Sequence, residues 1–302
     1  MKLRLIFYFS FLLFSINFNE AKGAACCGGG FAIPSIITGD DKAQLTTSLS
    51  FTEVVVDNVD SQGIWRNWDE HQNVQVLRIE GGHIFDDLWQ VGFSLPVIQR
   101  VRQSETHSGL GDISINVGYE YLSDWNYNPY RPKGIAFVQL IFPTGRPRAE
   151  SEVGGLDSRG NGFWALGAGT VLTKSIGRWD AFTSIDFHRS FEKRIRSSSF
   201  TGTLKPGLGG NLGLGLGYNM NGFRLGSSIT WTQEDPILMS SNLQTDRVSI
   251  ERFATTVVSL SHMTTSQWSG TLSYTDQTLF GDPQNTSLGR GILFQFQKRW
   301  AR

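Results

Sequence analysis

Apolar and polar residues alternate with a period of two along most of the chain from residue 42 onward. In the first such stretch, Leu45, Leu49 and Phe51 stand at odd positions, and Thr46 and Ser48 at even ones. A period of two places the two sets on opposite faces of a β-sheet. The pattern therefore predicts strands with one apolar face and one polar face.

Twelve segments follow this scheme. The clearest are 43–52, 89–97, 112–121, 164–172, 179–187, 208–218, 223–231, 268–274 and 292–300, and weaker ones are 74–83, 135–142 and 247–262. A soluble β-sandwich also alternates, but its strands are usually about 5–6 residues long. Most of these segments are long enough for a tilted membrane strand of about 9–11 residues. An even number of strands returns both ends of the barrel to the periplasm.

The connecting segments alternate between short and long. Short ones are expected at 86–87, 175–178, 219–222 and 264–267, and long ones at 58–70, 145–160, 193–204, 235–246 and 279–288. Bacterial barrels pair short periplasmic turns with longer outer loops. Ser123–Lys133 is the exception, because it is a longer connector on the side where short turns are expected.

The positions of aromatic and charged residues agree with this arrangement of short turns and long loops. Trp89, Trp179, Phe223 and Trp268 each come directly after a short turn, where amphipathic rings suit a membrane–water boundary. Charged residues gather instead toward the outer strand ends. Residues 42–302 are therefore predicted to form an all-β fold, a transmembrane antiparallel β-barrel of about 12 strands in an up-and-down meander.

The N-terminus has a different composition. Lys2 and Arg4 precede an apolar run over 5–18, and small residues follow. This order is typical of a secretory signal peptide, so we expect residues 1–23 to direct Sec-type export and to be removed. Residues 24–41 then form a Gly-rich periplasmic segment. Cys26 and Cys27 within it have three open readings, which are lipidation of Cys26, a disulfide, or two free thiols.

Composition narrows the class further. Hydrophobic residues make up 39% of the chain, which is low for a helical membrane protein, and the formal net charge is zero. Zero net charge gives no sign of nucleic-acid binding. The expected location is the outer membrane of a Gram-negative bacterium. The expected partners are membrane lipid, the barrel insertion machinery and a small-molecule solute.

Polar residues at the alternate strand positions that face inward are candidates for the lumen lining. They are Arg78, Glu80, Asp112, Asn116, Glu120, Asp186, His188, Arg224 and Arg299. One interpretation is a polar constriction that selects solutes by charge and hydrogen bonding. The other is an internal salt-bridge lattice that fills a narrow barrel. Twelve strands lie between the filled barrels of eight and the open channels of sixteen, so strand number does not decide between the two.

One inward row consists of glycines. Gly207, Gly209, Gly213, Gly215 and Gly217 alternate with leucines, and their spacing differs from that of a nucleotide-binding loop. A strand without inward side chains suits a bound solute, a folded-in loop or a tight bend.

A catalytic site is the least favoured hypothesis. His188 and Ser190 share a face, as in the Ser–His–Asn site of the outer-membrane phospholipase, a barrel of twelve strands. However, 200–204 on the next strand offers no Asn, and a nucleophilic Ser needs an oriented base and an oxyanion donor. No sequence motif indicates a metal site or a cofactor, so we expect neither catalysis nor a cofactor.

Several short motifs resemble a known family. Ser108-Gly109-Leu110-Gly111-Asp112 opens one strand, and Phe142-Pro143-Thr144-Gly145 ends the next. Together with 86–92 and Leu95-Pro96, these motifs resemble the outer-membrane barrels labelled "MetA-pathway of phenol degradation". The resemblance is concentrated in 80–146. It implies uptake of small aromatic or apolar compounds and supplies no defined binding site. Unlike barrels that end on an aromatic residue, this chain continues for two residues after Trp300.

These observations favour a monomeric outer-membrane channel or transporter for small molecules. A structural or surface-interaction barrel with a closed lumen is the first alternative, and a barrel-embedded esterase is the second.

Overall fold

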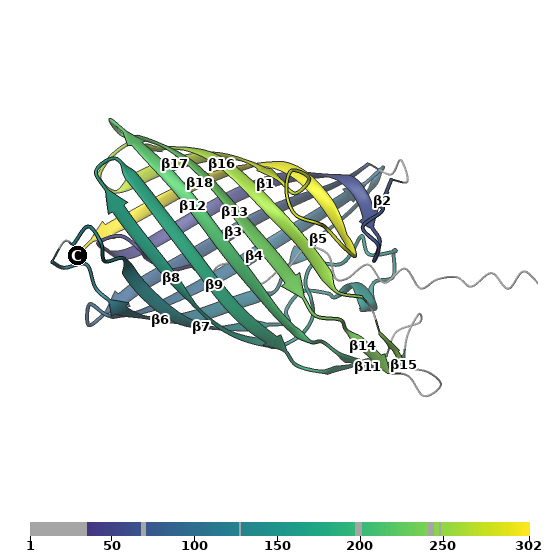
Figure 1. Cartoon of the computed structure of the whole chain (residues 1–302). Coiled ribbons are helices and arrows are strands. Elements are labelled where there is room, and N and C mark those ends of the chain that lie inside the picture. The colour runs from purple at the N-terminus through teal and green to yellow at the C-terminus, as the bar shows by residue number, and fades with distance from the viewer. Residues whose placement is uncertain (1–34, 68–70, 127, 197–200, 241–244, 248) are drawn as a thin grey trace, which may run out of the picture.

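Twelve long strands close into a barrel in the computed structural model, which describes residues 35–67, 71–126, 128–196, 201–240, 245–247 and 249–302 (Figure 1). The barrel strands are β1 (Asp41–Val59), β3 (Gln72–Phe85), β4 (Trp89–Arg102), β6 (Ile113–Leu122), β7 (Lys133–Phe142), β8 (Ala165–Ile176), β9 (Trp179–Ser190), β12 (Leu208–Met220), β13 (Phe223–Glu234), β16 (Glu251–Met263), β17 (Trp268–Asp276) and β18 (Thr286–Ala301). All twelve lie at predicted positions.

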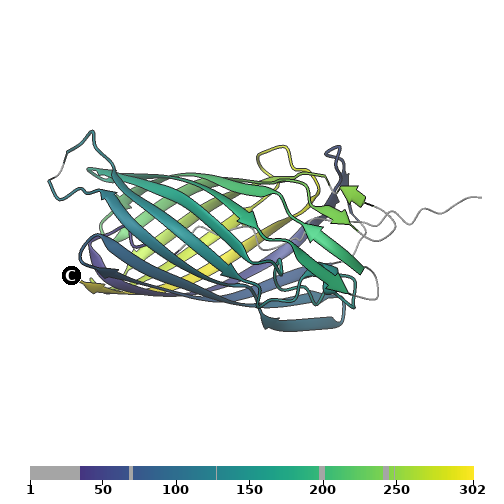
Figure 2. The same ribbon diagram turned by 90° about the horizontal axis from the view of Figure 1, so that it is seen from below.

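Each barrel strand pairs antiparallel with its neighbours in the sequence order of the barrel strands. The last strand, β18, pairs with β1 from Asp41↔Ala301 to Val59↔Thr286 and so closes the sheet. The strands cross the barrel axis at a strong tilt, as Figures 1 and 2 show. Closure satisfies the backbone groups that an open edge would leave unpaired. The predicted up-and-down meander of 12 strands is confirmed.

The two faces of the sheet differ as the alternation predicts. On β1, Leu45 and Phe51 are about two-fifths exposed on the outside, whereas Thr46 and Ser48 are buried inside. On β12, Leu212, Leu214 and Leu216 form the outer row. An apolar outer band of this kind is stable in hydrocarbon, whereas its exposure to water would cost free energy. In the described part of the chain, no helix is both long enough and apolar enough to cross a membrane.

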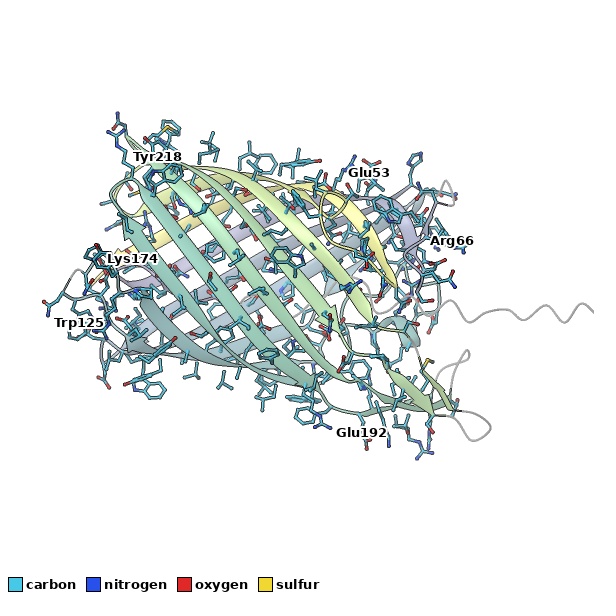
Figure 3. All side chains as sticks on the ribbon, in the orientation of Figure 1. Glu53, Arg66, Trp125, Lys174, Glu192 and Tyr218 are labelled. Atoms are coloured by element: carbon cyan, nitrogen blue, oxygen red, sulfur yellow. The ribbon has the colours of Figure 1, made fainter. Side chains whose placement is uncertain are left out.

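The two ends of the barrel differ in the length of their connections. The short turns and the C-terminus lie at one end, the turn end, and the long loops lie at the other, the loop end (Figure 1). Figure 3 places Trp125, Lys174 and Tyr218 at the turn end. It places Glu53, Arg66 and Glu192 at the loop end. The longer connector at 123–132 does lie at the turn end, as expected.

Aromatic pairs surround the turn end. The ring centroids of Trp89 and Tyr119 are 4.7 Å apart, and those of Trp179 and Tyr218 are 4.8 Å apart. Trp268 lies under Lys298, whose Nζ is 5.2 Å from the ring. These tryptophans are half-exposed on the outside, as expected for rings at a membrane boundary.

The loop end carries short strands between the barrel strands. They are β2 (Trp65–Arg66), β5 (Glu105–Leu110), β10 (Lys193–Arg196), β11 (Thr201–Lys205), β14 (Leu238–Ser240) and β15 (Thr245–Arg247), with one 3-10 turn, η1 (Arg148–Glu150). Strands β10, β11, β14 and β15 form a separate sheet beyond the barrel rim. Ile195 and Leu204 of that sheet bury themselves against Phe163, which anchors the sheet to the 143–164 loop.

Candidate functional site in the barrel lumen

The inward glycines of β12 make room for side chains from both neighbouring strands. A Cβ at Gly217 would lie 2.3 Å from Arg224 Nη2, and one at Gly209 would lie 2.3 Å from His188 Nε2. Arg224 therefore reaches across β12 from β13 to Asp180 on β9, with Nε 2.9 Å from Oδ2. His188 Nε2 reaches in the opposite direction and lies 2.8 Å from Glu234 Oε1.

Between these two ion pairs, hydrogen bonds connect further inward side chains of β9, β12 and β13. Asn211 Nδ2 donates to Asp186 Oδ1 at 3.0 Å, and Thr232 Oγ1 donates to Asn211 Oδ1 at 2.7 Å. The Phe182 ring lies against Gly215. The glycine row is thus explained by neighbouring side chains that cross it, an arrangement that differs from all three expected uses. On this side the lumen wall is a salt-bridge lattice.

A third ion pair lies inside the barrel toward the turn end. Lys133 Nζ of β7 is 3.2 Å from Glu120 Oε2 of β6, and both side chains are almost fully buried. The same ammonium donates to the carbonyl oxygen of Gly39 at 3.3 Å. Gly39 precedes β1, so this bond brings the N-terminal segment into the lumen.

The described part of that segment, Ser35–Gly39, lies against the inside of the barrel. Ile37 N donates to Gln90 Oε1 at 2.7 Å, and Ile37 is only 1% exposed. Asn116 Nδ2 donates to the carbonyl of Ser35 at 3.3 Å. Gly92 permits this approach, because a Cβ there would lie 2.3 Å from that carbonyl oxygen.

Ser35–Gly39, the described end of the predicted Gly-rich segment 24–41, thus lies in the lumen, where inward amide side chains and glycines bind it. Residues 24–34, with Cys26 and Cys27, and the expected signal peptide over 1–23 lie outside the described residues.

At the loop end, the 143–164 loop between β7 and β8 folds toward the lumen. Asp112, just before β6, accepts hydrogen bonds from Gly145 N at 2.9 Å, Asn161 N at 2.7 Å and Gly162 N at 3.3 Å. Arg100 of β4 is buried, and its Nε donates to the Ser158 carbonyl at 2.8 Å. Barrel wall residues thus hold both ends and the middle of the loop.

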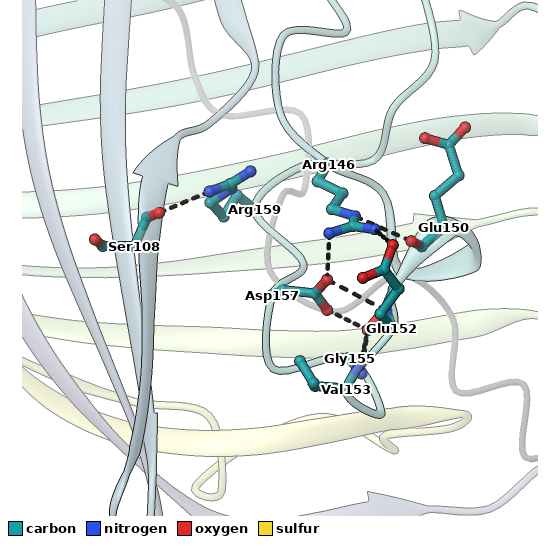
Figure 4. A network of polar contacts seen from close by, with 9 residues as sticks. Ser108, Arg146, Glu150, Glu152, Val153, Gly155, Asp157 and Arg159 are labelled. Atoms are coloured by element: carbon teal, nitrogen blue, oxygen red, sulfur yellow. Dashed lines mark hydrogen bonds and ion pairs between the residues drawn. The ribbon is translucent and has the colours of Figure 1, made fainter. Parts of the chain in front are cut away.

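A polar network stiffens the loop itself (Figure 4). Arg146 Nη1 lies 2.8 Å from Asp157 Oδ2, and its Nη2 lies 2.7 Å from Glu152 Oε1. Burial acts to raise the pKa of the Asp157 carboxyl, but hydrogen bonds from Ser151 and from the Glu152 N–H, with the charge of Arg146, outweigh it. The pKa of Asp157 therefore lies below its ordinary value, and the carboxylate form stabilises the loop.

A cavity of about 90 Å³ remains between the loop and the barrel wall. Its lining is drawn from β3, β4, β6, β7, β8, β9 and β13 and from the loop. The charged lining residues are Arg78, Asp112, Arg159, His188 and Glu234, and the others are Ser94, Pro96, Ile98, Ser114, Gln139, Ile141, Gly160, Asn161, Phe163, Ala165 and Ser190.

The structure brings only some of the predicted lumen residues together. Arg78, Asp112 and His188 line this cavity. Asp186 and Arg224 belong to the lattice around β12, and Asn116 and Glu120 lie near the N-terminal segment. Glu80 is half-buried on β3, and Arg299 Nη1 lies 3.8 Å from Asp41 Oδ2 at the turn end.

Sequence reasoning missed several partners of these residues. Lys133, Asp180, Glu234 and Arg159 each contact the lumen wall or line the cavity, and so does Gln139. The first three lie at or near a strand end, and each faces one of the predicted inward residues. Lys133 faces Glu120 on the neighbouring strand, whereas Asp180 and Glu234 face their partners two strands away, across β12. The sequence around Arg159 gives no comparable indication, because a loop that folds inward shows no alternation of apolar and polar residues.

The arrangement around His188 differs from that of a catalytic base. Its Nε2 faces Glu234, and its Nδ1 lies 3.7 Å from Asp186 Oδ1, so both ring nitrogens face carboxylates. A base for Ser190 would need a free nitrogen that accepts the hydroxyl proton. Within the described ranges, no cluster of three or more His, Cys, Asp or Glu residues could hold a metal ion.

Comparison with solved structures identifies the same fold. An outer membrane channel from Pseudomonas putida F1 is similar to this chain with a TM-score of 0.67 and 15% identity, over 88% of this chain and 100% of that one. The NanC porin matches with a TM-score of 0.49 and 7% identity, over 84% of this chain and 98% of that one. No family model and no curated protein matches the sequence. The likeness to the Pseudomonas channel shows the outer-membrane β-barrel fold.

Proposed function

We propose that the protein is an outer-membrane channel of a Gram-negative bacterium that passes small molecules without catalysis. The observation that carries the proposal is the cavity between the 143–164 loop and the wall, which lies inside a closed barrel with a lipid-compatible outer face. A loop folded into a barrel narrows the passage to a few side chains, which can then select solutes. The fold shared with a channel from Pseudomonas putida F1 is consistent with this function.

The size of the cavity limits what passes in this conformation. A volume of about 90 Å³ holds roughly three waters at ~30 Å³ each, whereas a cavity that binds benzene measures about 150 Å³. Passage of an aromatic molecule therefore requires the 143–164 loop to shift. The loop is attached through polar contacts at Asp112, Arg100 and Arg159, which can break without loss of the barrel.

The competing candidate is a structural barrel with a closed lumen. The ion pairs that cross β12 and the Ser35–Gly39 segment favour it, because both occupy lumen space. A closed barrel would present its loop-end sheet, β10–β11–β14–β15, as the working surface.

Swelling of proteoliposomes separates the two candidates. Vesicles that contain the purified protein should swell in isotonic solutions of small solutes, faster than empty vesicles do. The resemblance to barrels of phenol degradation makes phenol and benzoate the first aromatic probes, with glycine and arabinose as polar ones. A barrel that migrates as folded but gives no swelling with any solute would refute the channel.

A further inference from the structure

The cavity beneath the 143–164 loop contains charges of both signs, but its acidic groups already have partners within the protein. Asp112 accepts three backbone N–H groups from the loop. Glu234 lies 2.8 Å from His188 Nε2. With three hydrogen bonds already accepted, Asp112 offers little to a cationic solute, and Glu234 is paired with His188.

The basic groups retain free donors. Arg78 lines the cavity, is half-buried, and has no hydrogen-bond or ion-pair partner within the described ranges. Arg159 Nη1 donates to the Ser108 carbonyl at 2.6 Å, but its Nε is buried and lacks a partner among the residues that the structure describes. Each guanidinium has five N–H donors, so several remain for a ligand. Glu80, two residues along β3 from Arg78, does not line the cavity.

A third polar group in the cavity also has hydrogen-bonding capacity that is unused. Gln139 of β7 is only 2% exposed, and its Oε1 has no hydrogen-bond partner in the described part of the chain. A buried acceptor without a partner is costly, and native proteins rarely keep one without a reason. Gln139 lines the same cavity as Arg78, so a solute bound by the arginine could also donate to this oxygen.

The remaining lining adds an apolar surface. Ile98, Ile141 and Phe163 lie around the same space, with Pro96 beside them. An inorganic anion would use the guanidinium donors but leave this surface uncovered. A small organic acid would use both, because its carboxylate accepts a two-pronged bond from an arginine while its carbon skeleton contacts the apolar residues.

We infer that this cavity is the selectivity site of the channel, that it favours small organic carboxylates, and that Arg78 is its specificity-determining residue. The inference rests on the proposed channel function and names its solute class. Arg78 attracts the anion into the cavity, and Gln139 accepts a hydrogen bond from a hydroxyl group on the solute. Cations meet two arginines, Asp112 with three hydrogen bonds already accepted, and Glu234 paired with His188.

Reversal potentials in planar bilayers test the inference with the full-length protein. A potassium chloride gradient gives the ratio of anion to cation permeability, and replacement of chloride by propionate or benzoate ranks the anions. We expect anion selectivity, with propionate more permeant relative to chloride than its mobility in water predicts. Arg78→Gln should lower the anion-to-cation ratio about threefold or more, and Arg78→Lys should retain most of it.

The control is Arg178→Gln, which removes an equal charge from an exposed turn far from the cavity and should leave the ratio unchanged. Open channels that favour cations, or an Arg78→Gln variant with wild-type selectivity, would overturn the inference and leave the channel function standing. Absence of current from the folded wild-type protein would refute the channel function itself. Migration of each variant as a folded barrel before heating shows that a changed ratio does not arise from misfolding.

Discussion

Arg224 and Asp180 form a two-pronged ion pair across a strand to which neither belongs. Arg224 Nε is 3.2 Å from Asp180 Oδ1 and 2.9 Å from Oδ2. Asp180 is opposite Gly217 of β12, and the Arg224 guanidinium lies over that glycine. The pair exists because Gly217 has no side chain. On this side of the lumen, the two ion pairs each span three strands, and a glycine of β12 makes room for each of them.

Gly217→Val should push the Arg224 guanidinium away from Asp180. We expect a loss of about 1–2 kcal/mol in the free energy of unfolding, measured by urea titration of the protein in detergent micelles. In an Arg224→Ala background the added side chain has room, so the same substitution should cost much less. Equal costs in the two backgrounds would show that Gly217 is needed for another reason.

The N-terminal segment should leave the lumen when Gly92 is enlarged. The Cβ of Gly92→Val would collide with the Ser35 carbonyl, which should release Ile37 from its buried position. With Cys26 and Cys27 changed to Ser, an Ile37→Cys variant reports this through its rate of alkylation by a charged maleimide. We expect labelling to rise about tenfold or more in the Gly92→Val background, in line with release of a buried group. Equal labelling rates would contradict the lumenal position of this segment.

The Asp157 network within the 143–164 loop should loosen only in strong acid. The pKa of Asp157 is lowered in the folded protein, so its stabilising contribution is complete above the ordinary value near 3.8 and is lost as pH falls through the folded value. Channel current should be the same at about pH 7 and pH 5 and become larger or noisier near pH 3.

Asp157→Asn removes that charge at every pH. The variant should show a larger or noisier current already at neutral pH. On acidification its current should change less than that of the wild type. Acid-induced noise of the same size in the wild type and the variant would assign the effect to other carboxyl groups.

The outer face should tolerate no charge at mid-strand. Leu214→Arg, on the outer row of β12, should cost about 2–4 kcal/mol in a bilayer, because the guanidinium would face hydrocarbon. Ser228→Arg on β13 is the matched control, because Ser228 faces the lumen and pairs near the same level. Folding yield into lipid vesicles measures both. A larger loss for Ser228→Arg would contradict the assignment of faces.

Local alternation was sufficient to predict the barrel but not what fills it. Leu212, Leu214 and Leu216 reveal an outer row because the period of two is a property of the strand itself. The contact of Ser35–Gly39 with Gln90 joins residues 53 positions apart and depends on a three-dimensional fit. The inward fold of the 143–164 loop onto Asp112 is equally nonlocal. The alternation identifies Asp112 as a lumen candidate. The three backbone N–H groups of the loop that donate to it are found only in the three-dimensional structure.

Single-channel recording of the purified protein in a planar lipid bilayer tests the central claim most directly. The claim predicts discrete current steps that are small, because the 143–164 loop and the Ser35–Gly39 segment narrow the lumen, and that grow in the Gly92→Val variant. A folded, inserted barrel that gives no steps in salt or in organic acids, with or without that substitution, would contradict it.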